Sequence, residues 1–357
     1  KGYYGHTKQN DRSVYADVLA SINKNFWDDK ISLNANIGAS INDMQEDAMY
    51  VKGGLAQITN KFHIGNINMN TSKRNESKWH DQVQSIFASA EVGWNHQLYL
   101  TLTGRNDWVS QLAFTSKGSY FYPSVGLSWL ISESFKLPEA ISYLKVRGSW
   151  AEVASSPSRY LTQMQYTYNE QTNTYEYPAN HYNTDLKPEN TKSWEFGLNA
   201  KFLKNRINFD MTLYRSNTYN QTFYVDASAS SGYKKNIVQT GNIQNRGWEV
   251  TLNATPVLNS DFSWKTSLNF SSNKNKIVKL HDDLQEMMYG PTSFSSSYAM
   301  KLIKGGSIGD IYGKAFVRDD QGNIVYETEG DNKGLPSVEG DGNTIKVGNA
   351  NPVFMMG

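Results

Sequence analysis

Cysteine is absent from the 357-residue chain, which excludes a disulfide framework and any site built on a thiolate. Long apolar runs are also missing: no stretch approaches the roughly 18 apolar residues that a membrane-spanning helix needs. Neither sign of charge dominates, because 35 basic against 34 acidic residues leave a net charge of +1. This balance gives no indication of nucleic acid or of a strongly acidic partner.

Aromatic residues are abundant and make up 13% of the chain, with 22 tyrosines and 9 tryptophans. Such a content suits interfacial girdles and stacking surfaces. The mean hydropathy of −0.60 does not exclude a membrane protein, because the strands of a membrane barrel place half of their side chains in a polar interior.

The clearest pattern lies at residues 31–41, where six apolar side chains alternate strictly with Ser, Asn, Asn, Gly and Ser. Alternate residues of a strand point to opposite faces, so this strand has one apolar and one polar face. The same alternation recurs at 14–22, 86–94, 98–103, 125–131, 144–150, 194–202, 207–213, 248–254 and 262–270. Ten such strands predict an all-β fold, specifically a transmembrane antiparallel β-barrel.

Short and long connections alternate between these segments, as in outer-membrane barrels with periplasmic turns and extracellular loops. Asn95-His96 and Lys204-Asn205 are turns of the hairpin type. We expect residues 1–357 to form one partial barrel domain, with a small hairpin near 311–317 and 322–326 and a strand cut off at 354–357. The long extracellular loops are expected at 42–79, 153–190, 216–242 and 271–351.

Catalysis and metal binding find little support. No nucleophile and base stand at a useful spacing, so we expect no enzyme and no cofactor. Scattered histidines are expected in loops or turns, at His6, His63, His80, His96, His181 and His281. Carboxylates on polar strand faces could serve a glycosidase, but the better interpretation is charge balance in the interior. That interpretation sets Glu91, Glu195, Asp210 and Glu249 against Lys145, Arg147, Lys201 and Lys265.

The segment Asp341-Gly342-Asn343 is similar to a calcium loop. Ser337 stands at the first acidic position, however, and the final bidentate acid is missing. A glycine-rich turn is favoured and no metal is expected.

Two sets of residues are candidates for ligand binding. Arg105, Asp107 and Trp108 lie where a strand rises into a loop, so they are either ligand contacts at the barrel mouth or a local ion pair under an aromatic cap. Residues 159–182 are rich in tyrosine, which stacks on sugars and grips peptides but also packs on itself. The second set comprises Tyr160, Tyr166, Tyr168, Tyr175, Tyr177 and Tyr182. Both alternatives stay open for each set.

Seven sequence blocks occur in a characteristic order. They are Thr-Gly-Arg-Asn-Asp-Trp at 103–108, Phe-Tyr-Pro-Ser-Val at 121–125, Leu-Lys-Val-Arg-Gly-Ser-Trp at 144–150, Leu-Lys-Pro-Glu-Asn at 186–190, Asn-Arg-Gly-Trp-Glu at 245–249, Phe-Ser-Trp at 262–264 with Asn-Lys-Asn at 273–275, and Gly-Asn-Ala-Asn-Pro at 348–352. Together they resemble the SusC/RagA-type TonB-linked outer-membrane transporters.

Two of these blocks also have a structural interpretation. Pro188 would end a loop in an extended conformation, since it cannot donate to a strand ladder. Gly247 would supply an unusual φ where the chain enters the strand at Trp248. Both blocks are expected to be structural rather than ligand-binding.

The resemblance implies a 22-stranded barrel, of which this chain would supply about ten strands without the plug domain and the closing strands. It further implies import of oligosaccharide or peptide across the outer membrane of a Gram-negative bacterium. The implied partners are the TonB-ExbB-ExbD complex, acting through the missing N-terminal region, and a SusD-like lipoprotein lid. Three rivals remain: a siderophore-type TonB importer, a passive porin and a soluble carbohydrate-binding or hydrolytic β-protein.

Overall fold

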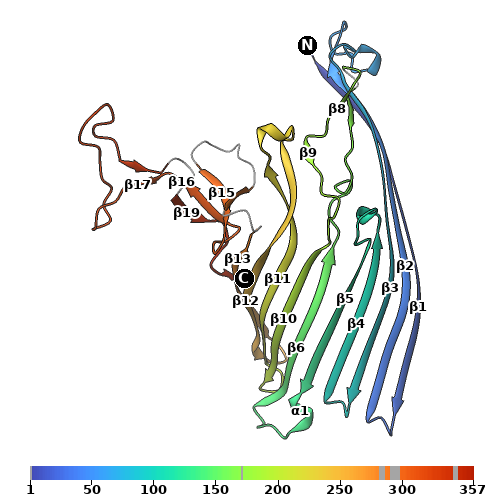
Figure 1. Cartoon of the computed structure of the whole chain (residues 1–357). Coiled ribbons are helices and arrows are strands. Elements are labelled where there is room, and N and C mark those ends of the chain that lie inside the picture. Colours follow the sequence, from blue (N-terminus) through green and yellow to red (C-terminus); the bar gives the residue numbers. More distant parts are fainter. Residues whose placement is uncertain (1, 170–171, 281–285, 290–297, 341–344) are drawn as a thin grey trace.

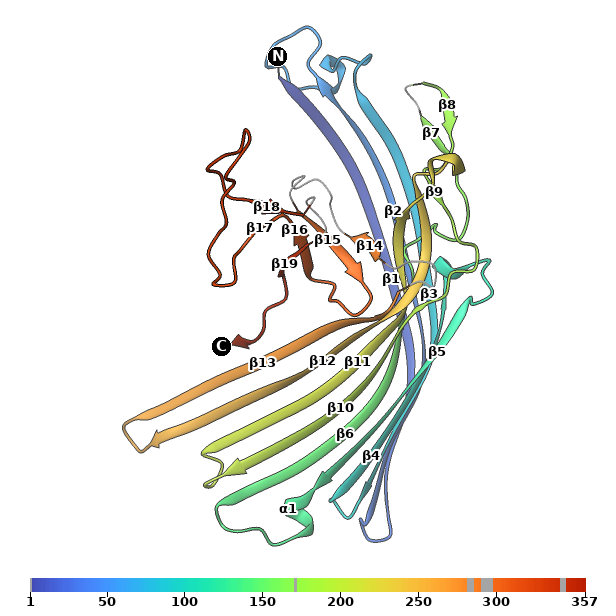
Figure 2. The same cartoon turned by 60° about the vertical axis from the view of Figure 1, so that its left-hand side comes forward.

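The computed structural model describes residues 2–169, 172–280, 286–289, 298–340 and 345–357. One large curved sheet forms most of the molecule (Figures 1 and 2). Its ten main strands follow each other in chain order, each antiparallel to the next, as predicted. They are β1 (Tyr3–Phe26), β2 (Ile31–Gly54), β3 (Lys73–Trp94), β4 (Leu98–Val109), β5 (Ser119–Leu130), β6 (Ile141–Ser155), β10 (Glu189–Phe202), β11 (Ile207–Asp226), β12 (Lys235–Leu258) and β13 (Ser263–Lys279).

The sheet curves like the wall of a barrel but does not close on itself (Figure 2). Its outermost strands are β1 at one end and β20 (Met355–Met356) beside β13 at the other. A short strand, β9 (Asn180–His181), adds to β12 in parallel. The described part is therefore a barrel wall segment with two edges.

The strand registers join the apolar faces of all ten strands into one surface. Residues directly opposite each other in an antiparallel pair share a face. In the first half of the sheet Ala20 faces Ile37, which in turn faces Ala88. In the second half the row Leu198, Met211, Val250 and Phe270 runs across four strands. The predicted two-faced pattern is therefore a property of the whole wall.

The tight turns at one end have left-handed residues at their centres, in loops of three residues at 95–97 and four residues at 203–206. Asn95 and His96 have φ angles of 49° and 57°, and Lys204 and Asn205 have 54° and 66°. Positive φ at both central residues gives a turn whose twist matches that of the flanking strands. The tight turns lie at this end of the wall (Figure 1).

At the other end the strands extend farther than the apolar alternation predicted. The predicted loops 42–79 and 216–242 are largely strand, because β2 runs to Gly54, β3 starts at Lys73, and β11 and β12 reach Asp226 and Lys235. Beyond the apolar band the backbone ladder continues with polar side chains on both faces. The predicted loop 153–190 shortens to 156–188 and contains β7 (Thr167–Asn169), β8 (Thr174–Glu176) and β9.

The predicted loop 271–351 begins with the end of β13 and then folds into a small module. Its four-stranded sheet consists of β14 (Glu286–Tyr289), β15 (Tyr298–Ile303), β16 (Asp310–Gly313) and β19 (Ile345–Asn349). An arm carries the pair β17 (Ala315–Phe316) and β18 (Val338–Glu339). Within the arm, Val325 N–H donates to Val317 O at 2.9 Å, so the predicted hairpin exists but turns at 319–323.

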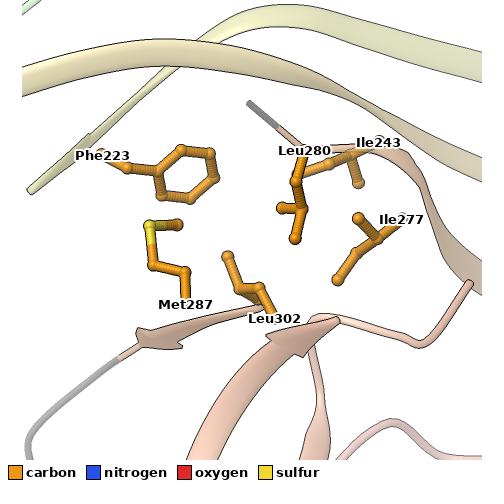
Figure 3. Close-up of a cluster of buried hydrophobic side chains, with 6 residues drawn as sticks. All are labelled: Phe223, Ile243, Ile277, Leu280, Met287 and Leu302. Carbon is orange, nitrogen blue, oxygen red and sulfur yellow. The ribbon is translucent and has the colours of Figure 1, made fainter. Parts of the chain in front are cut away.

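A hydrophobic core fixes this module to the wall (Figure 3). Phe223, Ile243 and Ile277 come from β11, β12 and β13, whereas Met287 and Leu302 come from the module. Leu280 completes the cluster, and none of the six side chains is more than 5% exposed. Burying apolar side chains of this size stabilises each by about 1.5–3 kcal/mol, so the module packs firmly against the top of the wall.

The helices are short: η1 (Ile64–Asn66), η2 (Ser110–Leu112), α1 (Ile131–Ser134) and η3 (Ala229–Ser231). Among the described residues, no helix combines the length and the apolar composition required to cross a membrane.

Gly247 corrects one expectation. It lies within β12 rather than at a strand entry, and its φ is not positive. What the position requires is space: a Cβ added there would collide with Ser272 O and lie 2.6 Å from Tyr214 Oη. Tyr214 is the cross-strand partner of Gly247, so the glycine makes room for an aromatic ring on the polar face.

Candidate functional site

The loop ends of the wall are anchored by a second hydrophobic cluster. Val109 ends β4, Leu112 lies in η2, Leu161 and Leu186 bracket the tyrosine-rich segment, and Ile237 belongs to β12. Leu112 and Leu186 are fully buried. Leu186 comes from the Leu-Lys-Pro-Glu-Asn block, and β10 starts directly after Pro188, as expected. The tyrosine-rich segment is therefore anchored at both of its ends.

Arg159 ties the same segment to β3. Its guanidinium lies 3.6 Å from the centroid of the Trp79 ring, and Nε donates to Asp81 Oδ2 at 2.9 Å. Asp81 is only 5% exposed, so its charge is compensated by this arginine. Beside it, Tyr160 has a positive φ of 62°. Tyr160 borders a cavity of about 570 Å³ that is also lined by Asn10, Arg12, Gln45, Glu46, Asp47, Lys78, Trp79 and His80.

The first predicted set divides between the two faces of β4. Arg105 Nε donates to Asp107 Oδ1 at 2.7 Å, and Tyr122 Oη donates to Asp107 Oδ2 at 2.6 Å. Arg105 Nη2 also donates to Ser85 Oγ at 2.7 Å. The local ion pair is therefore present, with both Asp107 oxygens occupied.

Trp108 does not cap this ion pair. As the next residue along a strand it points to the opposite face, where it lines a groove with Ile41 and Ile86 of the apolar surface. The aromatic ring near Arg105 is instead that of Phe87, whose centroid lies 5.5 Å from the guanidinium carbon.

The predicted tyrosines fall into separate groups. Tyr166 and Tyr177 make an edge contact with a centroid distance of 5.5 Å, and Tyr233, which the sequence did not single out, lies 5.7 Å from Tyr177. The His181 ring lies tilted against Tyr233, with a centroid distance of 4.9 Å. We call Tyr166, Tyr177, His181 and Tyr233 the aromatic cluster. The hydrogen bond with Tyr233 raises the pKa of Tyr177.

The other predicted tyrosines lie outside the aromatic cluster. Tyr168 packs on Tyr175 within the β7–β8 hairpin, with a centroid distance of 5.2 Å. Tyr182 is half-buried against the cluster around Leu186. Tyr166 and Tyr177 remain 55% and 56% exposed, so the aromatic cluster offers ring surface to a ligand while Tyr182 serves packing.

Lower on the polar face, one of the predicted charge-balancing pairs is formed. Arg147 grips Asp210 through two hydrogen bonds of 3.1 and 2.9 Å. Asn199 Nδ2 donates to the same carboxylate at 2.8 Å, and Arg147 also reaches Thr212 Oγ1. Within the described residues, Lys145, Lys201 and Lys265 form no ion pair with the predicted carboxylates.

A polar network joins the module to the wall and includes residues of three of the sequence blocks. Asp310 is 1% exposed and accepts from Lys346 Nζ at 2.6 Å and from Asn349 Nδ2 at 2.6 Å. Ser307 N–H donates to its other oxygen at 2.9 Å. Burial alone would raise the pKa of Asp310, but these hydrogen bonds outweigh it and lower the pKa.

The network continues into the wall through asparagines. Asn351 Nδ2 donates to Ser307 Oγ at 3.0 Å. Asn275 Oδ1 accepts from Ile308 N–H at 2.9 Å, and Asn275 Nδ2 donates to Asn245 Oδ1 at 3.0 Å. The Gly-Asn-Ala-Asn-Pro block is thus the joint between module and barrel.

Some of the histidines do not lie in the loops or turns where they were expected. His6, His80 and His181 lie in strands rather than in loops or turns, and His80 Nε2 lies 2.7 Å from Asp43 Oδ2. Across the described ranges no three metal-ligating side chains of His, Asp or Glu come together. His281 and the calcium-like Asp341-Gly342-Asn343 lie outside the described residues.

Comparison with known proteins gives a consistent result. A family profile described as "TonB dependent receptor-like, beta-barrel" matches residues 1–321. TonB-dependent receptor P3 of Formosa agariphila is 26% identical over 345 residues, covering 93% of this chain and 33% of that protein. TonB-dependent receptor SusC of Bacteroides thetaiotaomicron is 28% identical over 211 residues, covering 55% of this chain and 21% of that protein.

Among solved structures, the RagAB peptide transporter superposes with a TM-score of 0.81 at 19% identity, covering 99% of this chain and 39% of that chain. At this identity the likeness concerns the fold. The chain spans about a third of the length of the first of these relatives and about two fifths of the solved structure.

Proposed function

Because this chain belongs to the TonB-dependent receptor-like β-barrel family, we propose that it forms barrel wall and mouth of an outer-membrane importer for oligosaccharides or peptides. The carrying observation is the continuous apolar outer surface over ten registered strands, with a hydrogen-bonded polar surface behind it. A membrane requires the first surface, and an aqueous import path requires the second. The membrane would be the outer membrane of a Gram-negative bacterium.

Energy and partners follow from the same family assignment. Import would depend on the TonB-ExbB-ExbD complex, which uses the inner-membrane proton gradient, and on a SusD-like surface lipoprotein over the mouth. The module and the arm, which carries exposed Phe316 and Leu335, stand at the loop end of the wall (Figure 1). They would meet such a lid. The substrate is moved unchanged, so the proposal involves no enzyme chemistry.

The aromatic cluster is the proposed ligand contact. Exposed rings at Tyr166 and Tyr177 offer flat surfaces that stack on sugar faces and on peptide side chains. The RagAB neighbour is described as a peptide transporter, which supports including peptides. Asp107 is buried and held by Arg105 and Tyr122, so we propose that this group shapes the polar wall and that Arg105, whose side chain is 38% exposed, is the member that can contact a ligand.

An uptake experiment tests this proposal. Cells that produce the complete protein would be supplied with labelled peptides and oligosaccharides, with and without an intact TonB system. We expect uptake of one of the two classes to require TonB; equal uptake without TonB would identify a passive pore instead.

The contact residues can be tested in the same cells. Tyr177→Ala and Tyr233→Ala should each weaken ligand binding by about two- to ten-fold, the range expected for the loss of one aromatic contact. Tyr326→Ala, an equally exposed tyrosine on the arm, serves as control. Unchanged binding in both cluster variants would refute the contact.

A further inference from the structure

Three basic side chains stand side by side on the outward face of the wall. Arg215 on β11 is the cross-strand partner of Arg246 on β12, and Arg246 is the partner of Lys274 on β13. Directly opposed residues have Cβ atoms about 5 Å apart. All three side chains are exposed. We call Arg215, Arg246 and Lys274 the basic row.

The wall itself supplies no counter-charge to the basic row. Like charges directly opposite each other on neighbouring strands are destabilising. No carboxylate among the described residues forms an ion pair with any of the three, and Arg215 donates to the neutral Asn217 Oδ1 at 3.3 Å. Lys78, on the same face of β3, is by contrast paired with Glu76 at 2.9 Å.

The height of the basic row on the wall indicates what could supply a negative charge to it. On β11 the apolar face runs from Ile207 to Leu213, and Arg215 follows immediately. At about 3.4 Å per residue, Arg215 lies about 27 Å along the strand from Ile207. With a strand tilt of about 40° this is about 21 Å in height, which places Arg215 near the upper edge of an apolar band about 25 Å tall. The basic row therefore lies at the level of the lipid headgroups.

Tryptophans and a pocket adjoin the basic row. Trp194 is the cross-strand partner of Arg215, and Trp194 and Trp248 are 54% and 38% exposed on the apolar side. Rings at this position mark the boundary between hydrocarbon and headgroups. A pocket of about 300 Å³ lies at the row, lined by Tyr214, Arg246, Gly247, Trp248, Ser272 and Lys274.

We propose that the basic row binds the phosphate groups of an anionic lipid in the leaflet at the loop end of the barrel. The phosphates would neutralise Arg246 and Lys274 at the pocket, while acyl chains lie along Trp194 and Trp248. Arginine and lysine both donate several hydrogen bonds to phosphate oxygens. A free anion would meet the charges but leave the neighbouring tryptophans uncovered, so the lipid is the better occupant. The inference rests on the membrane placement of the proposed function but not on what is imported.

The test uses the complete protein in lipid nanodiscs. One set contains a phosphate-bearing anionic lipid diluted in a zwitterionic lipid, the other only zwitterionic lipid, and bound lipid is counted by native mass spectrometry. Basic residues near a membrane surface contribute about a five-fold affinity for anionic lipid each. Arg246→Gln/Lys274→Gln should therefore lower the preference for the anionic lipid about thirty-fold, and Lys78→Gln less than two-fold.

Two further arms make the result decisive. The charge-conserving variant Arg246→Lys/Lys274→Arg should keep the preference to within about three-fold, which separates lost charge from lost folding. Inorganic phosphate added at millimolar concentration should not displace the lipid. The inference is overturned if the glutamine variant retains the full preference, if Lys78→Gln loses as much, or if inorganic phosphate competes fully. Ligand uptake in the same variants reports on the proposed import function separately, because the basic row faces away from the import path.

Discussion

An arginine placed at successive depths of the apolar face should cost more free energy of folding the nearer it lies to the middle of the membrane. Strand β4 offers a series of outward residues, Leu98, Leu100 and Leu102, between the tight turn at Asn95 and the polar Asn106. Each step of two residues advances about 7 Å along the strand. Leu102 is thus midway through the apolar band and Leu98 is at its edge.

The expected magnitudes follow from this depth. Arginine on a lipid face costs about 2–4 kcal/mol at the midplane and about 0–1 kcal/mol near the interface. Leu102→Arg should therefore destabilise by about 2–4 kcal/mol, Leu98→Arg by at most about 1 kcal/mol, and Leu100→Arg by an intermediate amount. Thr101→Arg should cost less than 1 kcal/mol, because residue 101 points to the polar face opposite Glu91.

The measurement is reversible unfolding of the complete protein from lipid vesicles by denaturant. Thr101→Arg is the matched control, since it adds the same charge one residue away on the same strand. Equal losses for Leu102→Arg and Thr101→Arg would refute the two-faced assignment. A flat profile over the three leucines would refute the placement of the band on β4.

Three other substitutions test separate features. Gly247→Ala should lower the free energy of unfolding by about 1–3 kcal/mol, because the added methyl collides with the backbone oxygen of Ser272. Gly348→Ala, with nothing within 4 Å of the added methyl, should be nearly neutral; equal losses in thermal unfolding of the two variants would contradict this. A double-mutant cycle of Arg147→Gln and Asp210→Asn should give a coupling near 1 kcal/mol, limited by solvent screening of side chains that are 38% and 33% exposed; a coupling indistinguishable from zero would contradict the paired geometry. Because the pKa of Asp310 is lowered in the folded module, ionised Asp310 stabilises the module in full when the pH is above the pKa of about 3.9 in the unfolded chain. This contribution is lost as the pH falls through the lower pKa of the folded state. Proteolysis of the module should accelerate over that acid range, and Asp310→Asn, cleaved faster already at neutral pH, should remove the acid step; an unchanged pH profile in the variant would show that Asp310 is not the group involved.

The sequence predicts the membrane part of the wall well, because hydrocarbon selects every second side chain independently of tertiary contacts. It predicts the upper part poorly. From Asp43 to Gly54, β2 carries polar residues on both faces, so no alternation marks it as strand. What keeps it extended is pairing with β1 and β3 over its whole length, and that pairing is not local in sequence.

The candidate site shows the same division. The pairing of Arg105 with Asp107 follows from their spacing of two residues on one strand, which places both on the same face. Trp108 comes directly after Asp107, so the same alternation places it on the other face. The expected aromatic cap was therefore inconsistent with the strand pattern. Tyr233 could not be found in this way, because it lies 56 residues from Tyr177. Which loops contact each other depends on where their buried anchor residues lie in the fold, and no periodic sequence pattern indicates this.

Several of the seven sequence blocks supply residues that hold parts of the fold together. Leu186 is buried beneath the tyrosine-rich segment, Gly247 makes room for Tyr214, and Asn349 holds Asp310 where module and wall meet. Each has a packing or hydrogen-bonding requirement that is independent of the ligand. The rings of Tyr166 and Tyr177, in contrast, pack within the aromatic cluster and keep more than half of their surface exposed. A likeness that rests on these structural residues therefore identifies the family, while the cargo of the proposed importer would depend on the segments between them.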